Sequence, residues 1–577
     1  MSGPATASKR DHLGNTLHTV RQLIKAGVVR FERPDKLIAL ARAISAWGPT
    51  PAAGYTASAI RVPLAIAIDD ELGTLTFAEL HRRTNALARG MRAAGVGEGD
   101  GIGILCRNHR GFVEATVACS KLGASALYLN TGFAGPQIRD VIAREDPAGL
   151  IFDEEYTGLV GDQASGRLCF IAWHDEPAGA GGGAAGGEGA GGAGAGREGA
   201  GGDAVGEGDR VTLESLISRG LAEDDADDLT PPSRRGKVVI LTSGTTGTPR
   251  GAARRQPESL SPAAALFSKI PLHAREPTVI AAPLFHTWGF AHFTLGLALS
   301  STLVLRRRFD PAEILEAAAT SRATALIVVP VMLQRILELP PEAISALDLS
   351  RLRIVAVSGS ALPGELATRV MDVLGDVVYN LYGSTEVAWV TIATPADLRA
   401  APGTAGRSPR GTTVRLYDEA DQPVEPGLPG RIFVANEMLF DGYTGGGSKA
   451  VIDGLMSTGD VGHFDEAGRL FVDGRDDDMI ISGGENVFPR EIEDLLHSHP
   501  EIDDVAVIGV PDEKFGQGLK AFVVRTAGSR LDPGAVKAHV KDNLAGYKVP
   551  REVVFVSELP RNSTGKVLKR ELRLREH

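Results

Sequence analysis

The feature that most constrains the fold is a repeated alternation of short apolar segments and helix-forming segments between residues 237 and 381. The apolar segments have the length and composition of strands buried on both faces of a sheet. The clearest helix signal is Asp310, a capping residue, followed by Pro311 and by Glu313 in the first turn. The mostly apolar segments cover residues 238–241, 279–282, 325–329, 352–357 and 377–381. This alternation predicts an α/β domain with largely parallel strands.

The chain of 577 residues is long enough for roughly two to four domains. After residue 475, short apolar segments at 505–508 and 521–524 alternate with helix-forming segments. We therefore expect a large N-terminal α/β domain over residues 61–475, which includes a small β subdomain. A small, mobile α+β domain is expected over residues 476–577.

The first 62 residues carry an excess of about six positive charges. Apolar residues have helical spacing at 17–24 and at 36–47, and Pro34 separates the two stretches. We interpret residues 1–60 as an extension of two helices packed on the main domain. A basic helix that faces a membrane surface is the alternative.

Residues 178–208 are almost all glycine and alanine with scattered charges. Such a stretch cannot bury enough apolar surface to offset its chain entropy, so we expect a disordered insertion in the first domain. The N-terminus lacks the apolar core of a signal peptide, and no window of 18 residues is apolar throughout. The expectation is a cytoplasmic protein without a transmembrane segment.

Charge and cysteine content narrow the class further. The net charge of -11 argues against a general nucleic-acid-binding protein, which is usually basic. Cys106, Cys119 and Cys169 show neither disulfide nor zinc-site spacing, and each lies in or beside an apolar stretch. We expect three buried free thiols that serve packing.

The strongest local motif is Leu-Thr-Ser-Gly-Thr-Thr-Gly-Thr-Pro-Arg-Gly at 241–251, directly after a predicted strand. Glycines let the backbone approach an anion closely, and hydroxyl and amide groups donate to phosphate oxygens. The Gly-Lys-Ser/Thr of a Walker loop is absent. The residues expected to contact phosphate are Thr242, Ser243, Gly244, Thr245, Thr246, Gly247 and Arg250.

This string resembles the phosphate loop of the adenylate-forming (AMP-binding) superfamily, and the chain looks similar to its bacterial fatty acyl–coenzyme A synthetases. Further family motifs follow in order over residues 60–577. The family usually has lysine where this chain has Arg250, which keeps the charge. The resemblance implies ATP, Mg²⁺ and coenzyme A as substrates and cofactor.

The string Asn-Leu-Tyr-Gly-Ser-Thr-Glu at 380–386 resembles the family's adenine and magnesium motif. A tyrosine ring offers a flat face to a purine, and a carboxylate beside hydroxyls suits Mg²⁺. By resemblance, Tyr382 stacks on adenine beside Gly383, Asn380 contacts the adenine edge, Thr385 holds a phosphate oxygen and Glu386 binds magnesium. In two later motifs, Asp460 would bind both ribose hydroxyls and Arg475 would support them.

The remaining motifs imply a moving C-terminal domain. Lys566, in Asn-Ser-Thr-Gly-Lys at 562–566, resembles the catalytic lysine that stabilises the charge growing at phosphorus. Asp477 resembles the hinge residue. Ser482, Gly483, Gly484 and Glu485 belong to a segment that resembles the one lining the coenzyme A tunnel.

By the same resemblance, the acid pocket is expected between two segments, each of which follows a predicted strand. His286, Trp288 and Gly289 belong to one, and Ser358, Gly359 and Ser360 to the other, where Ser360 also contacts the nucleotide. His286 either gates the carboxylate or caps the strand. Residues 285–293 contain no aspartate of the kind that amino-acid-activating relatives use, so an apolar pocket favours a fatty or an aryl acid.

Together these residues predict an AMP-forming acid–thiol ligase that converts a carboxylic acid, expected to be a medium- or long-chain fatty acid, through acyl-AMP to acyl–coenzyme A. A fatty acyl-AMP ligase that loads a carrier protein, a non-catalytic nucleotide-binding relative and a luciferase-like oxidase are the alternatives. Acyl chain length is left open, and so is the oligomeric state, for which a homodimer is one option.

Overall fold

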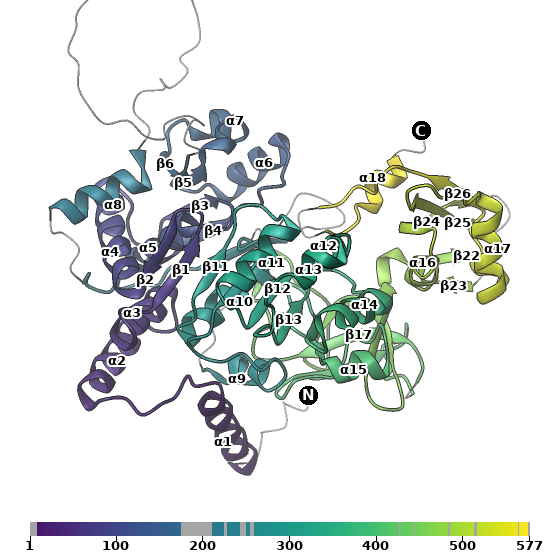
Figure 1. The fold of residues 1–577 in the computed structure, drawn as a ribbon, viewed down its shortest axis with the longest axis horizontal. Coiled ribbons are helices and arrows are strands. Elements are labelled where there is room, and N and C mark those ends of the chain that lie inside the picture. The colour runs from purple at the N-terminus through teal and green to yellow at the C-terminus, as the bar shows by residue number, and fades with distance from the viewer. Residues whose placement is uncertain are drawn as a thin grey trace, which may run out of the picture.

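The computed structural model describes residues 9–174, 211–223, 228–242, 250–253, 259–425, 427–444, 446–482, 485–512, 516–562 and 565–574. Figure 1 shows a large body and, at its right, a smaller body formed by the C-terminal elements. Within the described residues the large body contains two eight-stranded sheets and a five-stranded β subdomain, and the small body contains one five-stranded sheet. The predicted architecture is thereby confirmed. The glycine- and alanine-rich stretch at 178–208 lies outside the described residues.

The N-terminal extension contains three helices rather than the two expected. They are α1 (Lys9–Lys25), α2 (Pro34–Trp47) and α3 (Pro51–Arg61). The prediction missed α3, which begins where the Thr50 side chain accepts a hydrogen bond from the amide of Ala53. Its buried face is made mostly of small residues, so the usual stripe of large apolar residues is absent from its sequence.

One eight-stranded sheet has the order β18-β9-β8-β4-β3-β5-β6-β7. It is parallel from β8 to β7, whereas β9 and β18 are antiparallel at one edge. The strands are β3 (Gly101–Leu105), β4 (Ser125–Tyr128), β5 (Gly149–Asp153), β6 (Leu168–Trp173), β7 (Val211–Thr212), β8 (Val238–Thr242), β9 (Arg250–Ala253) and β18 (Gly442–Tyr443). The helices between them are α4 (Phe77–Ala93), α5 (Arg110–Leu122), α6 (Gly135–Glu145), α7 (Thr157–Val160) and α8 (Leu213–Ala222).

The other eight-stranded sheet has the order β15-β14-β13-β12-β10-β11-β1-β2 and is parallel except at its two ends. Its strands are β1 (Ile66–Asp70), β2 (Gly73–Thr76), β10 (Thr278–Ile280), β11 (Leu303–Leu305), β12 (Ala325–Val328), β13 (Ile354–Val357), β14 (Val378–Tyr382) and β15 (Thr391–Ala393). Its helices are α9 (Ser261–Phe267), α10 (Thr287–Leu299), α11 (Pro311–Thr320), α12 (Pro330–Leu337), α13 (Pro341–Ser345), α14 (Gly364–Leu374) and α15 (Pro395–Ala400). The start of α11 is as predicted, since the Asp310 side chain accepts from the amides of Ala312 and Glu313.

The two large sheets share one continuous apolar core. Three aromatic rings meet in it: Tyr55 of α3 and Phe112 of α5 have their ring centroids 6.3 and 6.5 Å from that of Phe293 in α10. Helix α10 is therefore held between the sheets, and its N-terminal end is fixed relative to both of them. Because dense packing of this kind resists displacement, the segment before α10 is a rigid place for a functional group.

The β subdomain and the C-terminal body complete the chain. The β subdomain consists of β16 (Thr413–Tyr417), β17 (Gly430–Ala435), β19 (Val451–Ile452), β20 (Leu455–Phe464) and β21 (Leu470–Arg475). A short 3₁₀ turn (Asp476–Asp478) follows β21. The C-terminal body contains β22 (Ile480–Ser482), β23 (Glu485–Val487), β24 (Ile502–Asp512), β25 (Gly516–Arg525), β26 (Glu552–Phe555), α16 (Pro489–His497), α17 (Pro533–Asn543) and α18 (Lys569–Leu574). It has an apolar core of its own.

Two expectations concern burial and membrane insertion. Cys106 and Cys119 are buried, but Cys169 on β6 is only half-buried, so the prediction of three buried thiols is wrong for one of them. Its position at the start of β6, where the burial pattern is incomplete, accounts for the difference.

Among the described residues, no helix has both the length and the apolar composition needed to cross a lipid bilayer.

Candidate active site

A cleft of about 2080 Å³ lies between the large and the small body. The two bodies touch beside it, where the Gln334 side-chain amide donates to the carbonyl oxygen of Asp503 at 3.2 Å. Many of the residues singled out from the sequence line this cleft. They are Arg250, Ser358, Gly359, Ser360, Asn380, Tyr382, Gly383, Thr385, Glu386, Asp460, Arg475 and Lys566. The fold thus brings together motifs separated by more than 300 positions in the chain.

The phosphate-loop motif connects β8 to β9. Thr242, the last residue of β8, pairs with Arg250, the first residue of β9. Residues Ser243, Gly244, Thr245, Thr246 and Gly247 lie outside the described residues. The Arg250 guanidinium lies 5.7 Å from the centre of the Tyr443 ring, which places its charge against an aromatic face at the cleft wall.

Glu386 is held in an ionised state by its neighbours. One carboxylate oxygen accepts a hydrogen bond from the Tyr443 hydroxyl at 2.7 Å, and the other accepts from the Ser384 hydroxyl at 2.8 Å. Burial acts to raise the pKa of Glu386, but these two hydrogen bonds and the charge of Lys449 outweigh it, so the pKa lies below its usual value. A carboxylate that is ionised and oriented in this way is suited to a divalent cation.

The glycine in the middle of this motif, Gly383, is required because there is no space for a side chain. A Cβ atom on Gly383 would collide with the backbone of Ala388, which itself has a left-handed conformation with φ of 61°. The turn folds tightly back here, so only glycine fits. The Thr385 hydroxyl lies 3.0 Å from that of Thr287, the first residue of α10. This contact links the Glu386 segment to the segment that carries His286.

Asp460 lies between a tyrosine and an arginine. Its carboxylate accepts a hydrogen bond from the Tyr382 hydroxyl at 2.6 Å, and its other oxygen lies 3.4 Å from Arg475. The pairing of β20 with β21 sets Asp460 directly opposite Arg475. Burial raises the pKa of Asp460 in spite of the Arg475 charge. Asp460 lines the cleft and still has lone pairs that can accept hydrogen bonds, as the binding of two ribose hydroxyls would require.

Lys566 reaches this cluster from the other body of the molecule. It lines the same cleft as Asp460, and its charge acts to lower the pKa of that carboxylate. The loop that carries it is fixed from within: the Asn562 side chain accepts from the Lys566 amide at 2.9 Å, and Arg561 donates to Asp504 at 2.6 Å. A Cβ on Gly565 would lie 2.5 Å from the Val331 side chain of α12, so glycine allows the loop to approach the large body closely.

The segment expected to border the acid lies beside the cleft. Of the described residues, those that line the cleft do not include His286, Trp288 or Gly289. Trp288 donates through its indole nitrogen to the carbonyl of Val328 at 3.0 Å, and burial lowers the pKa of His286 to about 4. His286 is therefore a neutral imidazole near pH 7. The segment is tightly packed, since a Cβ on Gly289 would collide with the carbonyl of Pro283.

Asn108 supports this segment and was not singled out from the sequence. Its side-chain amide donates to the carbonyls of Ile280 and Ala282, both at 3.0 Å, and its carbonyl oxygen accepts from the amide of Leu284 at 2.8 Å. Asn108 comes from the turn after β3, in the other large sheet. A single asparagine in a turn gives no local signal of such a role, because its partners are backbone groups more than 170 positions away.

His292 is a second residue that sequence reasoning missed. It lies on α10, four residues after Trp288, and the two rings meet edge to face with centroids 4.4 Å apart. His292 is only 2% exposed, and its Nε2 atom is buried without a hydrogen-bond partner among the described residues. Burial lowers its pKa to about 3, so it is neutral. A buried polar atom left without a partner is energetically costly.

Lys449 is a third such residue. It follows the glycine-rich stretch after Tyr443 and lines the cleft together with Thr444 and Gly446. Its ammonium lies next to Gly459, where an added Cβ would be 3.3 Å from Nζ, and its charge lowers the pKa of both Glu386 and Asp460. The amide of Thr444 also donates to the carbonyl of Gly251 at 2.7 Å, which ties this stretch to β9.

The motifs assigned to the hinge and to coenzyme A follow β21 at the start of the small body. The backbone of Asp477 forms part of the 3₁₀ turn between the two bodies. Ser482 and Glu485 pair at the end of the β22–β23 hairpin, and the Gly483 and Gly484 positions between them lie outside the described residues.

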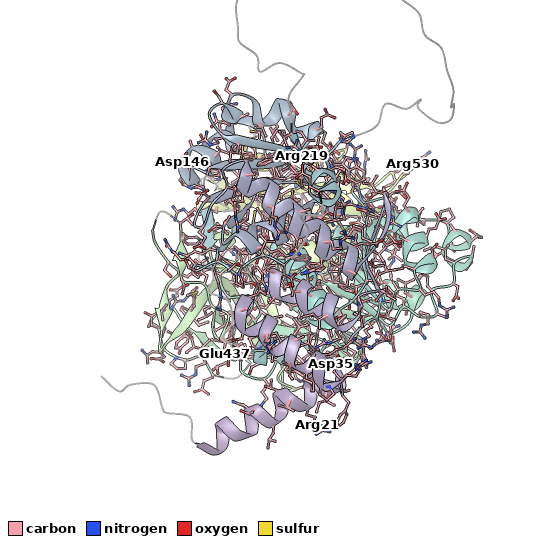
Figure 2. The ribbon with its side chains drawn as sticks, turned by 90° about the vertical axis from the view of Figure 1, so that its left-hand side faces the viewer. Arg21, Asp35, Asp146, Arg219, Glu437 and Arg530 are labelled. Atoms are coloured by element: carbon pink, nitrogen blue, oxygen red, sulfur yellow. The ribbon has the colours of Figure 1, made fainter. Side chains whose placement is uncertain are left out.

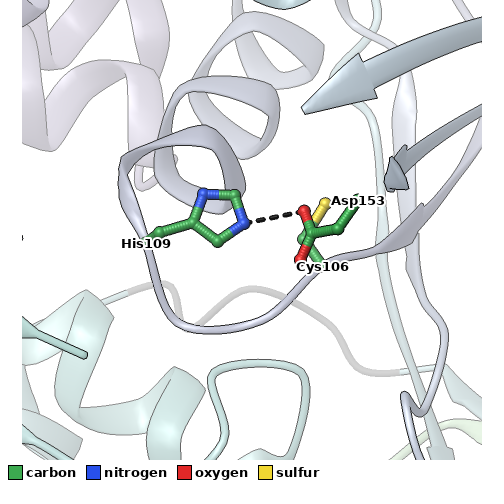
Figure 3. A group of neighbouring side chains, drawn as sticks. All are labelled: Cys106, His109 and Asp153. Carbon is green, nitrogen blue, oxygen red and sulfur yellow. Dashed lines mark hydrogen bonds and ion pairs between the residues drawn. The ribbon is translucent and has the colours of Figure 1, made fainter. Parts of the chain in front are cut away.

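A separate buried cluster brings Cys106, His109 and Asp153 within 4.8 Å of one another, as Figure 3 shows. Its polar atoms already have partners. His109 accepts from the amide of Gly111 through Nδ1 at 3.0 Å and donates through Nε2 to Asp153 at 2.8 Å, and Asp153 also accepts from the amide of Arg107. Burial raises the pKa of the Cys106 thiol well above its ordinary value. The cluster is therefore a satisfied structural network rather than a nucleophile or metal centre.

Comparison with known proteins identifies the family. Residues 56–444 match the model of the AMP-binding enzymes, and residues 491–566 match the model of the AMP-binding enzyme C-terminal domain. The chain therefore belongs to the AMP-binding enzyme family, within the adenylate-forming superfamily that the sequence motifs indicated. It is an enzyme of that family, with the large and small domains that family members have.

Individual relatives have similar length and fold. The chain is 34% identical over 518 residues to a feruloyl-CoA synthase from an Amycolatopsis species, an alignment that covers 89% of this chain and 96% of the relative. It is 32% identical over 506 residues to an indoleacetate–CoA ligase from Aromatoleum aromaticum, covering 86% and 92%. The solved structure of ATP-bound MatB from Rhodopseudomonas palustris is 26% identical, with a TM-score of 0.73 and coverage of 89% and 96%.

Proposed function

We propose that this enzyme is an ATP-dependent, AMP-forming ligase that joins an aromatic carboxylic acid to coenzyme A. The observation that carries the proposal is the meeting of three groups in one cleft: Glu386 and Asp460 from the large domain and Lys566 from the small domain. A cation beside a site for a nucleotide is the arrangement that phosphoryl and nucleotidyl transfer require.

In the first half-reaction a carboxylate oxygen of the acid attacks the α-phosphorus of ATP. The bond between that phosphorus and the oxygen bridging to the β-phosphate breaks, so acyl-AMP forms and pyrophosphate leaves. Lys566 stabilises the negative charge that grows on the α-phosphate oxygens, while Asp460 and Tyr382 position the ribose and adenine. Mg²⁺ held by Glu386 would neutralise charge on the phosphates when bound. Arg250 and Lys449 supply further positive charge at the same wall.

In the second half-reaction the thiol of coenzyme A, as it loses its proton, attacks the acyl carbonyl carbon. The carbon–oxygen bond to AMP breaks, and AMP and the thioester are released. The segment with Ser482, Gly483, Gly484 and Glu485 is assigned to coenzyme A by its resemblance to the family motif. We infer that the small domain turns about Asp477, so that Lys566 leaves and this segment enters with the thiol.

The acid is proposed to be aromatic rather than the fatty acid expected from the sequence. Both of the curated relatives described above are named for arylated acids. The segment assigned to the acid is rich in aromatic rings, with Trp288 and Phe290 on α10 and Tyr128 whose centroid lies 5.1 Å from that of Phe290. His292, whose Nε2 lacks a partner among the described residues, would meet a hydroxyl or carbonyl group on the substrate ring.

The decisive test measures acid-dependent release of pyrophosphate and AMP, with and without coenzyme A, over straight-chain, benzoic, arylacetic and hydroxycinnamic acids. Lys566→Ala should lower the rate of adenylation by about 100-fold or more. Lys541 is an exposed lysine on α17, and Lys541→Ala should leave this rate unchanged. Accumulation of acyl-AMP with no use of coenzyme A would assign the chain to the carrier-loading ligases. Absence of pyrophosphate with every acid would refute the catalytic assignment.

The role of His292 has its own test. If its imidazole binds a polar ring substituent, His292→Phe should lower kcat/KM for a 4-hydroxylated aryl acid by about 10-fold or more relative to the unsubstituted acid. The unsubstituted acid serves as the matched control for folding and for the chemical step. An equal loss with both acids would show that His292 only fills space, and preference for straight-chain acids would return the assignment to a fatty acid ligase.

A further inference from the structure

The N-terminal helices expose an unusual concentration of large apolar side chains. In the described part of the chain, eight of the eighteen large apolar side chains that are exposed lie between residues 17 and 44. They are Leu17, Val20, Ile24, Val29, Phe31, Leu37, Ile38 and Ile44. Phe31 is 109% exposed, that is, free of contact along its whole side chain. Isolated exposed apolar residues are ordinary, but a cluster of this size indicates an interaction surface.

These side chains form stripes on the outer faces of two helices. On α1, Leu17, Val20 and Ile24 are spaced three and four residues apart, so they share one face. Another face of α1 is occupied: Leu23 is buried, and the Thr19 hydroxyl bonds to that of Ser261 at the start of α9 at 3.3 Å. The apolar stripe is therefore not needed to hold α1 on the domain.

Helix α2 repeats the pattern. Leu40, Ala43 and Trp47 are buried against the domain, whereas Leu37 and Ile44, seven residues apart, are exposed on another face. The segment between the helices adds the exposed side chains of Val29 and Phe31. Figure 2 looks onto this side of the molecule, where Arg21 and Asp35 mark the lower end of the chain's first helices.

Basic residues lie among the apolar ones. Arg21, Lys25, Arg30, Arg33 and Arg42 are all exposed. The only two acidic residues between 14 and 62 already pair with arginines: Glu32 with Arg61 at 3.7 Å and with Arg275 at 3.3 Å, and Asp35 with Arg33 at 3.1 Å. This region is thus positive in a chain whose net charge is -11. This local excess of positive charge favours an anionic partner.

We propose that this surface, formed by α1, α2 and residues 28–33, docks the enzyme on an anionic lipid membrane. Apolar side chains enter the interface while the neighbouring basic groups contact anionic headgroups, which is how interfacial helices bind. A second copy of this chain is a poorer occupant, because it would set two positive surfaces against each other. The surface also precedes residue 56, where the match to the AMP-binding family model begins, so the family's catalytic unit does not require it.

Membrane docking would place the ligase beside the lipid bilayer, in which apolar acids concentrate. It would not enter the chemistry, because none of the surface side chains that the structure describes lines the cleft between the two domains. Substitutions on the surface should therefore leave adenylation of a water-soluble acid unchanged. This separation lets the docking proposal and the proposed ligase activity succeed or fail independently.

The test is co-sedimentation of the full chain with vesicles of phosphatidylcholine alone or with about 30% phosphatidylglycerol. Binding is expected only with the anionic vesicles and should weaken strongly in about 0.5 M salt, which screens the headgroup charge. Each basic side chain removed should cost about five-fold in partitioning. Arg21→Glu combined with Lys25→Glu should thus reduce binding by about 25-fold or more, and Phe31→Ser by several-fold.

Matched controls lie elsewhere on the surface. Arg530→Glu reverses an exposed charge in the C-terminal domain, at the opposite end of the view in Figure 2, and Val373→Ser removes an exposed apolar side chain on α14. Neither should change vesicle binding. Equal binding to both vesicle types, or no difference between the surface variants and the controls, would overturn the proposal. A dimer that Phe31→Ser dissociates, with no vesicle binding, would assign the surface to a second copy, and binding only to an acidic protein would overturn the lipid assignment as well.

Discussion

Asn108 offers the most quantitative test of how the fold positions the acid-binding segment. Its amide makes three buried hydrogen bonds, to the carbonyls of Ile280 and Ala282 and from the amide of Leu284. It is 5% exposed and belongs to the turn after β3, so these bonds join the two large sheets. Asn108→Ala removes all three of these bonds at once, from backbone groups that lie just before His286.

The expected loss follows from these contacts. A hydrogen bond contributes about 1 kcal/mol net, and a buried polar group left unpaired costs about 1–3 kcal/mol. Allowing for partial relaxation and for entering water, three such groups give a loss of about 3–5 kcal/mol in the free energy of unfolding. A domain stable by about 5–15 kcal/mol remains folded after such a loss. Because the loosened segment leads into α10, KM for the acid should rise by about 10-fold or more.

Urea unfolding followed by tryptophan fluorescence, with steady-state kinetics on the same preparation, measures both effects. Asn85→Ala is the matched control: Asn85 is also buried, at 1% exposed, and bonds to Lys121 away from the cleft. It should lower stability without raising KM for the acid. The reasoning fails if Asn108→Ala lowers the free energy of unfolding by less than about 1 kcal/mol. It also fails if Asn85→Ala raises KM for the acid as much as Asn108→Ala does.

Three further predictions concern the groups around the nucleotide and the small domain. Lys449→Met should raise KM for ATP by about 10-fold and leave KM for the acid unchanged, since it removes a cation beside the phosphates; an unaltered KM for ATP would place Lys449 outside the contact. Tyr443→Phe removes the 2.7 Å hydrogen bond to Glu386, which contributes about 1.5–3 kcal/mol because its acceptor is charged. The rate of adenylation should therefore fall by about 10- to 100-fold and recover in part at high Mg²⁺. A wild-type rate would contradict the role of that bond. Burial acts to lower the pKa of His497, but Asp504 at 3.3 Å outweighs it and the pKa is raised above 6.5. The protonated His497 therefore stabilises the folded state fully below pH 6.5, and this stabilisation is lost as the pH rises through the folded-state pKa. The melting temperatures of the wild type and His497→Gln should differ at about pH 6 and converge near pH 9. A difference in melting temperature that stays constant with pH would refute this.

The sequence predicted the elements whose signals are local. The parallel strands of the second large sheet appear as uninterrupted apolar segments because both of their faces are buried. The start of α11 at Asp310 was predicted because its capping chemistry lies within four consecutive residues. Helix α3 was missed, since its contact face consists of small residues, and Cys169 was placed too deep, since local apolarity does not reveal where the burial of a strand ends.

The site divides in the same way. Residues expected to contact ATP occur in short strings whose combination of glycines, hydroxyls and charged groups is typical of a phosphate-binding turn, so Glu386, Asp460 and Lys566 could be named from the sequence. Lys449, Asn108 and His292 carry no such signal. What distinguishes each of them is its surroundings in the fold. The charge of Lys449 acts on the carboxylate of Glu386, and Asn108 donates to backbone carbonyls of the other large sheet. His292 is distinguished by its Nε2 atom, which has no partner among the described residues.

The sequence by itself therefore determined the fold class and the family, and it predicted the groups proposed to bind the nucleotide, because helix caps, buried strands and phosphate-binding turns are encoded within a few residues. Only the tertiary structure decided that Lys566 of the small domain lines the same cleft as Asp460 of the large one, and that apolar and basic residues of α1 and α2 are exposed together. Whether a side chain is buried, paired or exposed depends on what packs against it, and that is set by contacts between segments that lie far apart in the chain.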